Sequence, residues 1–388
     1  MFLSCGSTLR ACAYARGMAA LLAVMLAAPF SYPAVAQSDA ARALGSLRLI
    51  GTQSIPHAQA FQQTTVGGLS GIDYDPRTGQ WLLISDDRSD HGPARWYTAR
   101  LEYDGQRFAA VTLTGMTSVR QADGAPYSSR LRGGRVPDAE TVRIDPLDGS
   151  VWYASEGDRV LTLDPVVRQT AKDGRLLGEV PTSPMFQVRL FGHQGPRNNL
   201  SYEGLTFAAD GHSLWVAMEG PLVQDGEPPT PEAGALARFT QYDRGGNLLR
   251  QVAYPIDPIP ATPGAGKHAD NGVSEILALD ATRLLVLERS AVQAADGRFA
   301  NYVRLYVADL TQATDVASLA SLADATIQPT TKRLVLDLNT LGLARLDNLE
   351  GLTWGPKLAN GNDTLVLVSD DNFNPAQQTL LLAFEVLP

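Results

Sequence analysis

GGLSGIDYDPRTGQWLLISDDRS, residues Gly67 to Ser89, is the stretch that decides the fold of this 388-residue chain. It predicts a β-hairpin, in which a short strand ending at Tyr74 meets a turn at Asp75–Gly79 and continues into a second strand at Trp81–Ile84. Aspartate caps its own backbone and glycine accepts positive φ, and both properties suit a tight turn. The second strand leads directly into the charged run Asp86–Arg88, so the meaning of that run depends on whether the chain repeats it.

The hairpin is repeated four more times. Each later segment has a short strand, a polar turn and a strongly apolar second strand, and the segments are DAETVRIDPLDGSVWYASEGDR (Asp138–Arg159), LSYEGLTFAADGHSLWVAMEG (Leu200–Gly220), GVSEILALDATRLLVLERS (Gly272–Ser290) and LDNLEGLTWGPKLANGNDTLVLVSDDN (Leu346–Asn372). Successive repeats lie 63 to 75 residues apart, which is enough chain for one four-stranded sheet with its loops. Internal repetition at this period is typical of β-propellers.

We therefore predict an all-β protein, a β-propeller of about five or six blades, each a four-stranded antiparallel sheet. Candidate outer strands lie at Arg95–Asp104, Ala237–Pro255 and Asn301–Leu310, and Thr379–Val386 is expected to pair with Leu47–Thr52 and close the ring. A β-sandwich or two small β domains remain as alternatives, although neither requires a repeated hairpin. A short helix is expected at 317–325, in an excursion between strands.

Acidic residues recur at both ends of the repeated hairpin. The residues before the first strands are Ser70, Glu140, Glu203, Glu275 and Glu350, and those after the second strands are Asp86, Glu156, Glu219, Glu288 and Asp370. In an antiparallel hairpin these two positions lie at the same end. A propeller would therefore gather the acids at one mouth of its channel.

Such a ring of carboxylates needs protonation, arginine partners or a hard cation, because like charges repel and burial raises the cost. We predict that Glu140, Glu203, Glu275 and Glu350 hold metal or activate water, and that the second set of acids completes a metal site. Arginines that follow the acids would hold an anionic group, and these are Arg88, Arg159 and Arg289. For each single residue, a structural salt bridge or a blade-end cap is the alternative.

Calcium (Ca²⁺) is the best cation candidate, because it prefers oxygen ligands and tolerates irregular geometry from several loops. Zinc is disfavoured by five scattered histidines and the lack of an H-E-x-x-H motif. Around Ser70 the sequence GGLSGI does not match the nucleophile elbow G-x-S-x-G. Neither a P-loop nor a Rossmann glycine pattern occurs.

The first 36 residues predict an export signal, with Arg10 and Arg16 before an apolar stretch at Met18–Ala28 and a small-residue cleavage site at Ala34–Ala36. Residues 37–388 are then a single exported propeller domain, periplasmic or secreted, without membrane insertion after cleavage. Both cysteines lie inside the signal, so we expect no disulfide or thiol chemistry in the mature chain. The formal net charge of −9 argues against nucleic acid as a partner. We expect a monomer.

At these motifs the chain resembles the phytase-like family, described as having esterase-like activity of phytase. The resemblance is carried by GLSGIDYDP (Gly68–Pro76), SDDRS (Ser85–Ser89), the glutamate motifs DAET, YEGL and LEGL, and the closing LVSDDNF (Leu367–Phe373). It covers nearly all of the chain after the predicted signal. The resemblance implies an exported propeller that hydrolyses phosphoesters or esters, with calcium.

Three alternative functions are consistent with these predictions. The first is a metal-assisted hydrolase of small anionic phosphoesters or related esters. The second is a non-catalytic propeller that binds a ligand or protein, with the acids as structural caps. A calcium-dependent lactonase is a third. Geometry separates them, because catalysis needs carboxylates open to solvent, whereas capping needs each glutamate bonded to backbone amides of a neighbouring blade.

Overall fold

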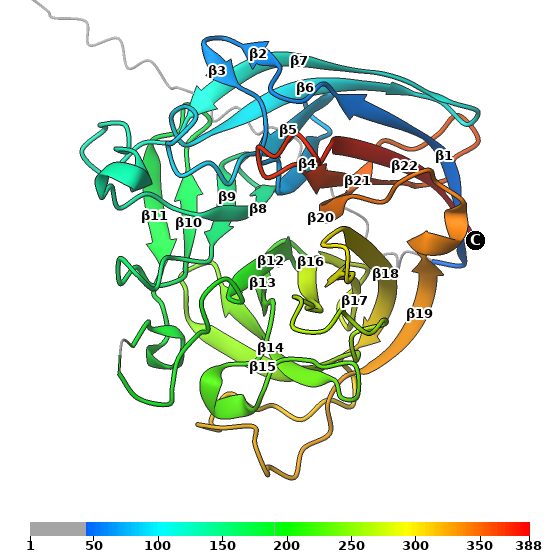
Figure 1. The fold of residues 1–388 in the computed structure, drawn as a ribbon. Coiled ribbons are helices and arrows are strands. Elements are labelled where there is room, and N and C mark those ends of the chain that lie inside the picture. The colour runs from blue at the N-terminus through cyan, green and yellow to red at the C-terminus, as the bar shows by residue number, and fades with distance from the viewer. Residues whose placement is uncertain (1–43, 190) are drawn as a thin grey trace, which may run out of the picture. The chain divides into compact units, whose positions relative to one another are not determined.

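The computed structural model describes residues 44–189 and 191–388, which belong to one compact unit, Gln37–Pro388. The predicted signal and both cysteines lie outside the described residues. Five four-stranded antiparallel sheets surround a central axis (Figure 1) and form a five-bladed β-propeller, as predicted. The innermost strands contact one another in a closed ring, in the order β4, β8, β12, β16 and β20.

The blades follow the chain in order. Blade 1 contains β4 (Gly71–Asp75), β5 (Gln80–Ile84), β6 (Arg95–Tyr103) and β7 (Phe108–Ser118). Blade 2 contains β8 (Ala139–Ile144), β9 (Val151–Ser155), β10 (Val166–Thr170) and β11 (Leu176–Val180). Blade 3 contains β12 (Tyr202–Phe207), β13 (Ser213–Met218), β14 (Ala235–Asp243) and β15 (Leu248–Ile256). Blade 4 contains β16 (Gly272–Ala278), β17 (Arg283–Gln293), β18 (Phe299–Asp309) and β19 (Thr331–Asp337).

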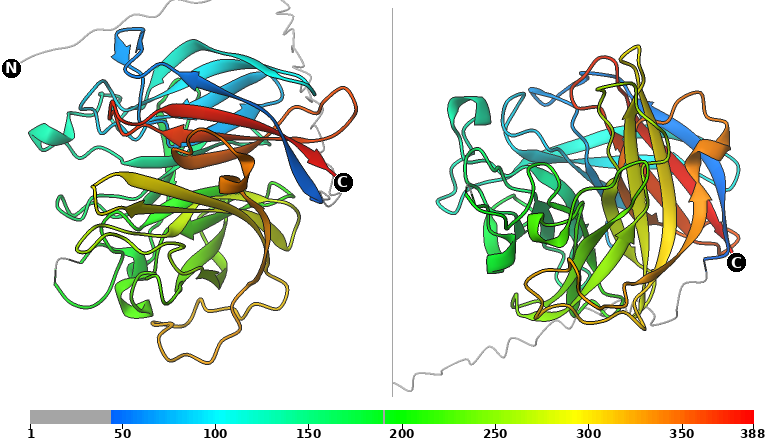
Figure 2. Two further views of the ribbon diagram at one scale, coloured as in Figure 1. Left: turned by 45° about the vertical axis from the view of Figure 1, so that its right-hand side comes forward. Right: turned by 60° about the horizontal axis from the view of Figure 1, so that its bottom comes forward.

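Blade 5 closes the ring with both ends of the described chain. Its strands are β20 (Asn348–Gly355), β21 (Thr364–Asp370), β22 (Thr379–Leu387) and, at the outer edge, β1 (Ser46–Ile55). Figure 2 shows β1 in blue beside the red C-terminal strands, and Leu49 lies opposite Phe384 in the register. The predicted pairing of these segments is confirmed, and it closes the ring by joining the N-terminal strand to the C-terminal blade.

The predicted hairpins are the two innermost strands of each blade, and their apolar residues pack between neighbouring blades. Trp152 and Val286 belong to one such buried cluster, and Leu352 and Leu367 to another. A short hairpin, β2 (Ala60–Phe61) and β3 (Thr64–Thr65), precedes blade 1. Among the described residues, four 3-10 turns lie in connecting loops, at η1 (Arg130–Arg132), η2 (Pro184–Phe186), η3 (Val223–Asp225) and η4 (Leu338–Leu341).

The prediction of a helix at 317–325 is wrong, because this segment has no regular secondary structure. Its alanine-rich composition favours a helix, but tertiary contacts decide its conformation. Val316 and Leu322 are buried against blade 3, and the Leu322 amide donates to Asp225 at 2.8 Å. Within the described part of the chain, no helix has the length and apolar character needed to cross a membrane.

Candidate functional site

An extra residue in the inner strand brings the acids to the channel mouth. In blades 2 to 5 the pairing of the two innermost strands skips one residue, and the skipped residues are Glu140, Glu203, Ser274 and Glu350. Blade 1 has Ser70 at the corresponding place, immediately before β4 begins. Such β-bulges redirect side chains and are common beside functional sites.

Eight carboxyl groups gather at this mouth, and we call them the carboxylate cluster. The members are Asp86, Asp138, Glu140, Glu156, Glu203, Glu219, Glu350 and Asp370. All are buried or nearly so, yet Glu140, Glu156 and Glu350 each keep 8% of their surface exposed. The acids of four blades thus meet where the loops begin.

Two arginines belong to the cluster. Arg88 Nη1 lies 2.9 Å from Asp138 Oδ2, and Arg289 Nη2 lies 3.3 Å from Glu219 Oε1 and 3.6 Å from Glu350 Oε1. Burial alone would lower the pKa of both guanidinium groups, but the surrounding carboxylates raise it instead. The two positive charges are thus retained, and they are too few to balance eight ionised acids.

The uncompensated acids respond by holding protons. Burial raises the pKa of Asp138 to about 6, with Arg88 opposing the shift. Burial raises the pKa values of Glu219 and Glu350 to about 7, with Arg289 opposing. For Asp86, Glu140, Glu156, Glu203 and Asp370 burial and then neighbouring acids raise the pKa well above its usual range. Groups that titrate near neutral pH in one cluster are typical of functional sites.

Blade 2 supplies the best cation ligands. One oxygen each from Asp138, Glu140 and Glu156 lies within 4.8 Å of the others, a spacing that suits shared Ca²⁺ coordination at 2.3–2.6 Å per ligand. Glu156 Oε2 and Glu219 Oε2 are both fully buried, and neither has a hydrogen-bond partner among the described residues. A buried carboxylate oxygen without a partner is costly, and a bound cation would satisfy it.

The channel is closed below the cluster by a buried ion pair. Arg143 Nη2 lies 2.8 Å from Glu275 Oε2, and the side chains are 3% and 0% exposed. The Arg143 guanidinium also donates to one backbone carbonyl in each of blades 1, 2, 4 and 5, at Ile72, Val142, Ile276 and Leu352. Glu275 in turn accepts from the Leu205 amide of blade 3 at 3.0 Å. This pair therefore joins all five blades at the axis.

Nine of the twelve predicted site residues belong to the cluster, counting Arg88 and Arg289, but Glu275 and Glu288 do not. The repeat in blade 4 is offset by one residue, since Ser274 occupies the bulge and Gly272 pairs with Arg289. Neighbouring residues in a strand face opposite sides, so the offset moves both acids out of the mouth. Glu275 lies one layer deeper, where burial raises its pKa to about 7 and Arg143 opposes the shift.

Glu288 instead lies inside blade 4. Its carboxylate accepts from Tyr254 Oη at 2.7 Å and from Lys332 Nζ at 2.5 Å, and Asn271 Nδ2 lies 3.2 Å away. Arg159 is also outside the cluster, because its Nη1 donates to the Pro196 carbonyl at 3.0 Å. Asp138, which sequence reasoning missed as a site residue, stands two residues before Glu140. Aligning the repeats on the apolar residue two positions after each bulge would have assigned Ser274, and not Glu275, to the bulge of blade 4.

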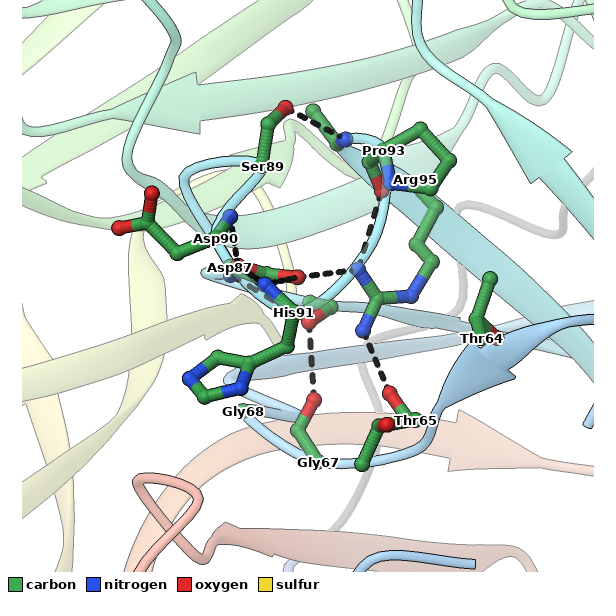
Figure 3. A network of polar contacts seen from close by, with 12 residues as sticks. Thr64, Thr65, Gly67, Gly68, Asp87, Ser89, Asp90, His91, Pro93 and Arg95 are labelled. Atoms are coloured by element: carbon green, nitrogen blue, oxygen red, sulfur yellow. Dashed lines mark hydrogen bonds and ion pairs between the residues drawn. The ribbon is translucent and has the colours of Figure 1, made fainter. Parts of the chain in front are cut away.

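The doubled acids of blades 1 and 5 divide their roles. The first acid of each pair, Asp86 or Asp370, belongs to the cluster. The second is structural: Asp87 Oδ2 accepts from Arg95 Nη1 at 2.6 Å, and Asp87 also accepts from the amides of Asp90 and His91 (Figure 3). Asp371 likewise accepts from the Gly68 amide at 3.0 Å. In the Asp86–Arg88 run, Asp86 and Arg88 therefore belong to the cluster, whereas Asp87 holds the loop in place.

A surface cavity at the opposite end of the propeller is a weaker candidate. It lies between blades 1 and 2 and is lined by Trp81, Trp96, Val151, Asp75 and Lys172, among others. Its carboxylate is already occupied, because Asp75 Oδ1 lies 2.9 Å from Arg77 Nε, and Arg77 and Lys172 lower its pKa against the effect of burial. The cavity lacks the convergence of acids seen at the mouth.

Comparison with known proteins gives three findings. Curated proteins provide no significant match. Among solved structures, the chain is similar to the catalytic domain of the Coprinopsis cinerea GH62 α-L-arabinofuranosidase, with a TM-score of 0.39 and 9% identity, over 88% of this chain and 96% of that chain. The family model named Phytase-like, described as "esterase-like activity of phytase", matches residues 64–373. The chain therefore belongs to the phytase-like family.

Proposed function

We propose that this protein is an exported, calcium-assisted hydrolase of small phosphoesters or related esters, and that the carboxylate cluster is its active site. One observation supports this most strongly: Glu156 Oε2 and Glu219 Oε2 are buried without a partner in a cluster of eight acids and two arginines. Family membership and the propeller fold are consistent with a hydrolase. The protein would act as a monomer in the periplasm or outside the cell.

Asp138, Glu140 and Glu156 would hold the cation, because their oxygens converge and one has no other partner. When bound, calcium would supply positive charge that polarises an ester or phosphoryl oxygen. It would also relieve repulsion among the acids and lower their pKa values. Glu203 is close enough to Glu140 to raise the pKa of Glu140. The negative charge of Glu203 would therefore add to the affinity of this site for the cation.

The arginines and the remaining acids suit the chemistry of an anionic ester. Arg88 is 36% exposed in its side chain and points its charge at the mouth, where it can bind a phosphoryl oxygen. Arg289 is more deeply buried and would stabilise charge that develops at the reacting centre. Glu219, with a free oxygen and a pKa of about 7, is best placed to accept a proton from the attacking water.

The alternative, a non-catalytic propeller with structural acids, fits Glu275 better than the cluster. Glu275 accepts from the backbone amides of Leu205 in the next blade and of Ile276, which is the pattern expected of a cap. Glu350, which does occupy a bulge, differs, since its Oε1 accepts from the Asn348 side chain and lies 3.6 Å from Arg289 Nη2. The cluster is therefore better explained by a ligand than by capping.

The test is hydrolysis by the protein from Gln37 onward, with an aryl phosphate, an aryl ester and a lactone as substrates. We expect cleavage of the aryl phosphate that is lost with a chelator and restored by calcium, and that falls at least 100-fold in Glu219→Gln, in the range of general-base contributions. Glu179→Gln, on the exposed edge of blade 2, should match the wild type. Equal, negligible rates on all three substrates would support the binding module, and cleavage of the lactone alone would support a lactonase.

A further inference from the structure

A stacked aromatic pair stands beside the carboxylate cluster and has no role in the chemistry described above. The rings of His91, from the blade 1 loop, and Phe373, from the blade 5 loop, are 4.1 Å apart with an interplanar angle of 13°. His91 is exposed and Phe373 is half-buried. We call these two residues the aromatic wall.

The wall touches the cluster through Gly68. A Cβ atom at Gly68 would lie 2.0 Å from Asp86 Oδ1 and 2.7 Å from Phe373 Cε2. The carboxylate of Asp86 and the edge of the Phe373 ring therefore lie against the same backbone atom, side by side. A substrate whose charged group occupied the cluster would extend its next atoms along this ring.

The wall is built at a conformational cost. Phe373 has φ of 51° and Asn372 before it has φ of 47°, a region that bulky residues rarely adopt and that costs of order 1 kcal/mol or more. The Asp371 carboxylate compensates by accepting from the Phe373 amide at 3.1 Å. Such strain clusters at ligand-binding positions, and here it turns the Phe373 ring toward the mouth.

His91 is held in place from the opposite side. Its amide donates to Asp87 at 3.1 Å, and Asp87 is fixed by the fully buried Arg95, which also donates to the Thr65 carbonyl. Figure 3 shows the imidazole pointing away from Arg95 and outward from this network. An exposed ring on a rigid loop loses little conformational entropy when a ligand stacks on it.

We propose that the aromatic wall binds the organic part of the substrate by stacking, so that the preferred substrates are phosphoesters with a flat ring next to the ester oxygen. Aryl groups and planar heterocycles fit this description, whereas short alkyl groups do not. An aromatic stack gains affinity beyond its buried area, and a substrate ring would extend this stack on a face that the two rings do not turn toward each other. The inference rests on the proposed function, because the cluster must hold the phosphoryl group.

The test compares binding of phenylphosphonate and methylphosphonate by isothermal titration calorimetry in the presence of calcium, which needs no turnover. We expect the wild type to bind phenylphosphonate about threefold to tenfold more tightly, in the range measured for aromatic pairs. His91→Ala and Phe373→Asn should abolish that preference without weakening methylphosphonate, and asparagine tolerates the positive φ. His212→Ala, an exposed histidine in the β12–β13 turn at the opposite end, should retain it.

A second readout reports on stacking directly. The imidazole proton signal of His91, assigned by its loss in His91→Ala, should shift upfield in the NMR spectrum with phenylphosphonate and stay in place with methylphosphonate. Equal affinities for the two compounds, or an unchanged preference in both variants, would overturn the proposal that the aromatic wall binds the substrate. The proposed phosphoester hydrolysis would be unaffected by that result. Binding of neither compound would contradict the proposed function itself, and the wall with it.

Discussion

Replacing Arg143 by methionine should destabilise the whole propeller, because this side chain joins the blades at the axis. The substitution removes the 2.8 Å ion pair to Glu275 and all donors to the carbonyls of blades 1, 2, 4 and 5. Removing one partner of a buried ion pair costs about 3–5 kcal/mol. At about 2 °C per kcal/mol for a domain of this size, the melting temperature should fall by about 6–10 °C.

The measurement is urea denaturation at pH 8 followed by circular dichroism, with thermal melting in parallel. Arg298→Met is the matched control, because its partner Asp296 lies in the same turn and the Arg298 side chain is 86% exposed; its loss should leave the unfolding free energy close to the wild-type value. The Arg143→Met deficit should shrink as the pH falls below about 7, since Glu275 is then protonated in the folded state and needs no counter-charge. A loss no larger than that of Arg298→Met would refute the central role of this pair.

Three further predictions concern the acids of the repeats and one glycine beside them. Without calcium, the unfolding free energy should fall as the pH rises from 5 to 8. Asp138 (pKa about 6) and Glu219 and Glu350 (pKa about 7) hold protons more tightly in the folded protein than in the unfolded chain, and that stabilisation is lost when they ionise. Urea titrations at stepped pH check this, and calcium should make the unfolding free energy depend less on pH. Gly68→Ala should cost more than about 1 kcal/mol, since φ is 62° and its Cβ would meet Asp86 Oδ1; Gly124→Ala, at a φ of 84° but in open space, should cost less in the same urea titrations. Glu288→Gln should lower the melting temperature but leave calcium binding unchanged by calorimetry, because Tyr254 and Lys332 hold that carboxylate inside blade 4; a loss of calcium binding would contradict its placement.

The repeated hairpin was sufficient to predict the blades, their closure and most of the acids at the mouth. Strand alternation and turn chemistry are local properties, so five copies of the same pattern specify five similar units. The closure was also predictable, because the apolar strand at 379–386 follows the last hairpin, and its second edge can pair with the strand that precedes the first hairpin.

The predictions failed where a shift of one residue in a strand changes which side a side chain faces. Counting acids placed Glu275 and Glu288 in the ring, whereas the β-bulge lies at Ser274 and reverses which side each neighbour faces. The Arg143–Glu275 pair was not predictable, since it joins positions 132 residues apart whose side chains meet only at the axis. The aromatic wall depends on positive φ at Asn372 and Phe373, which no local pattern in the sequence indicates.

Calcium titration by calorimetry tests the central claim most directly, namely that the carboxylate cluster binds a cation. The protein from Gln37 onward, stripped with chelator, should bind calcium at pH 8 and gain thermal stability as the concentration rises. The double variant Glu140→Gln/Glu156→Gln should lose this binding while remaining folded, because it removes charge from two ligands that repel each other in the empty site. Absence of binding by the wild type, or unchanged binding by the double variant, would contradict the account.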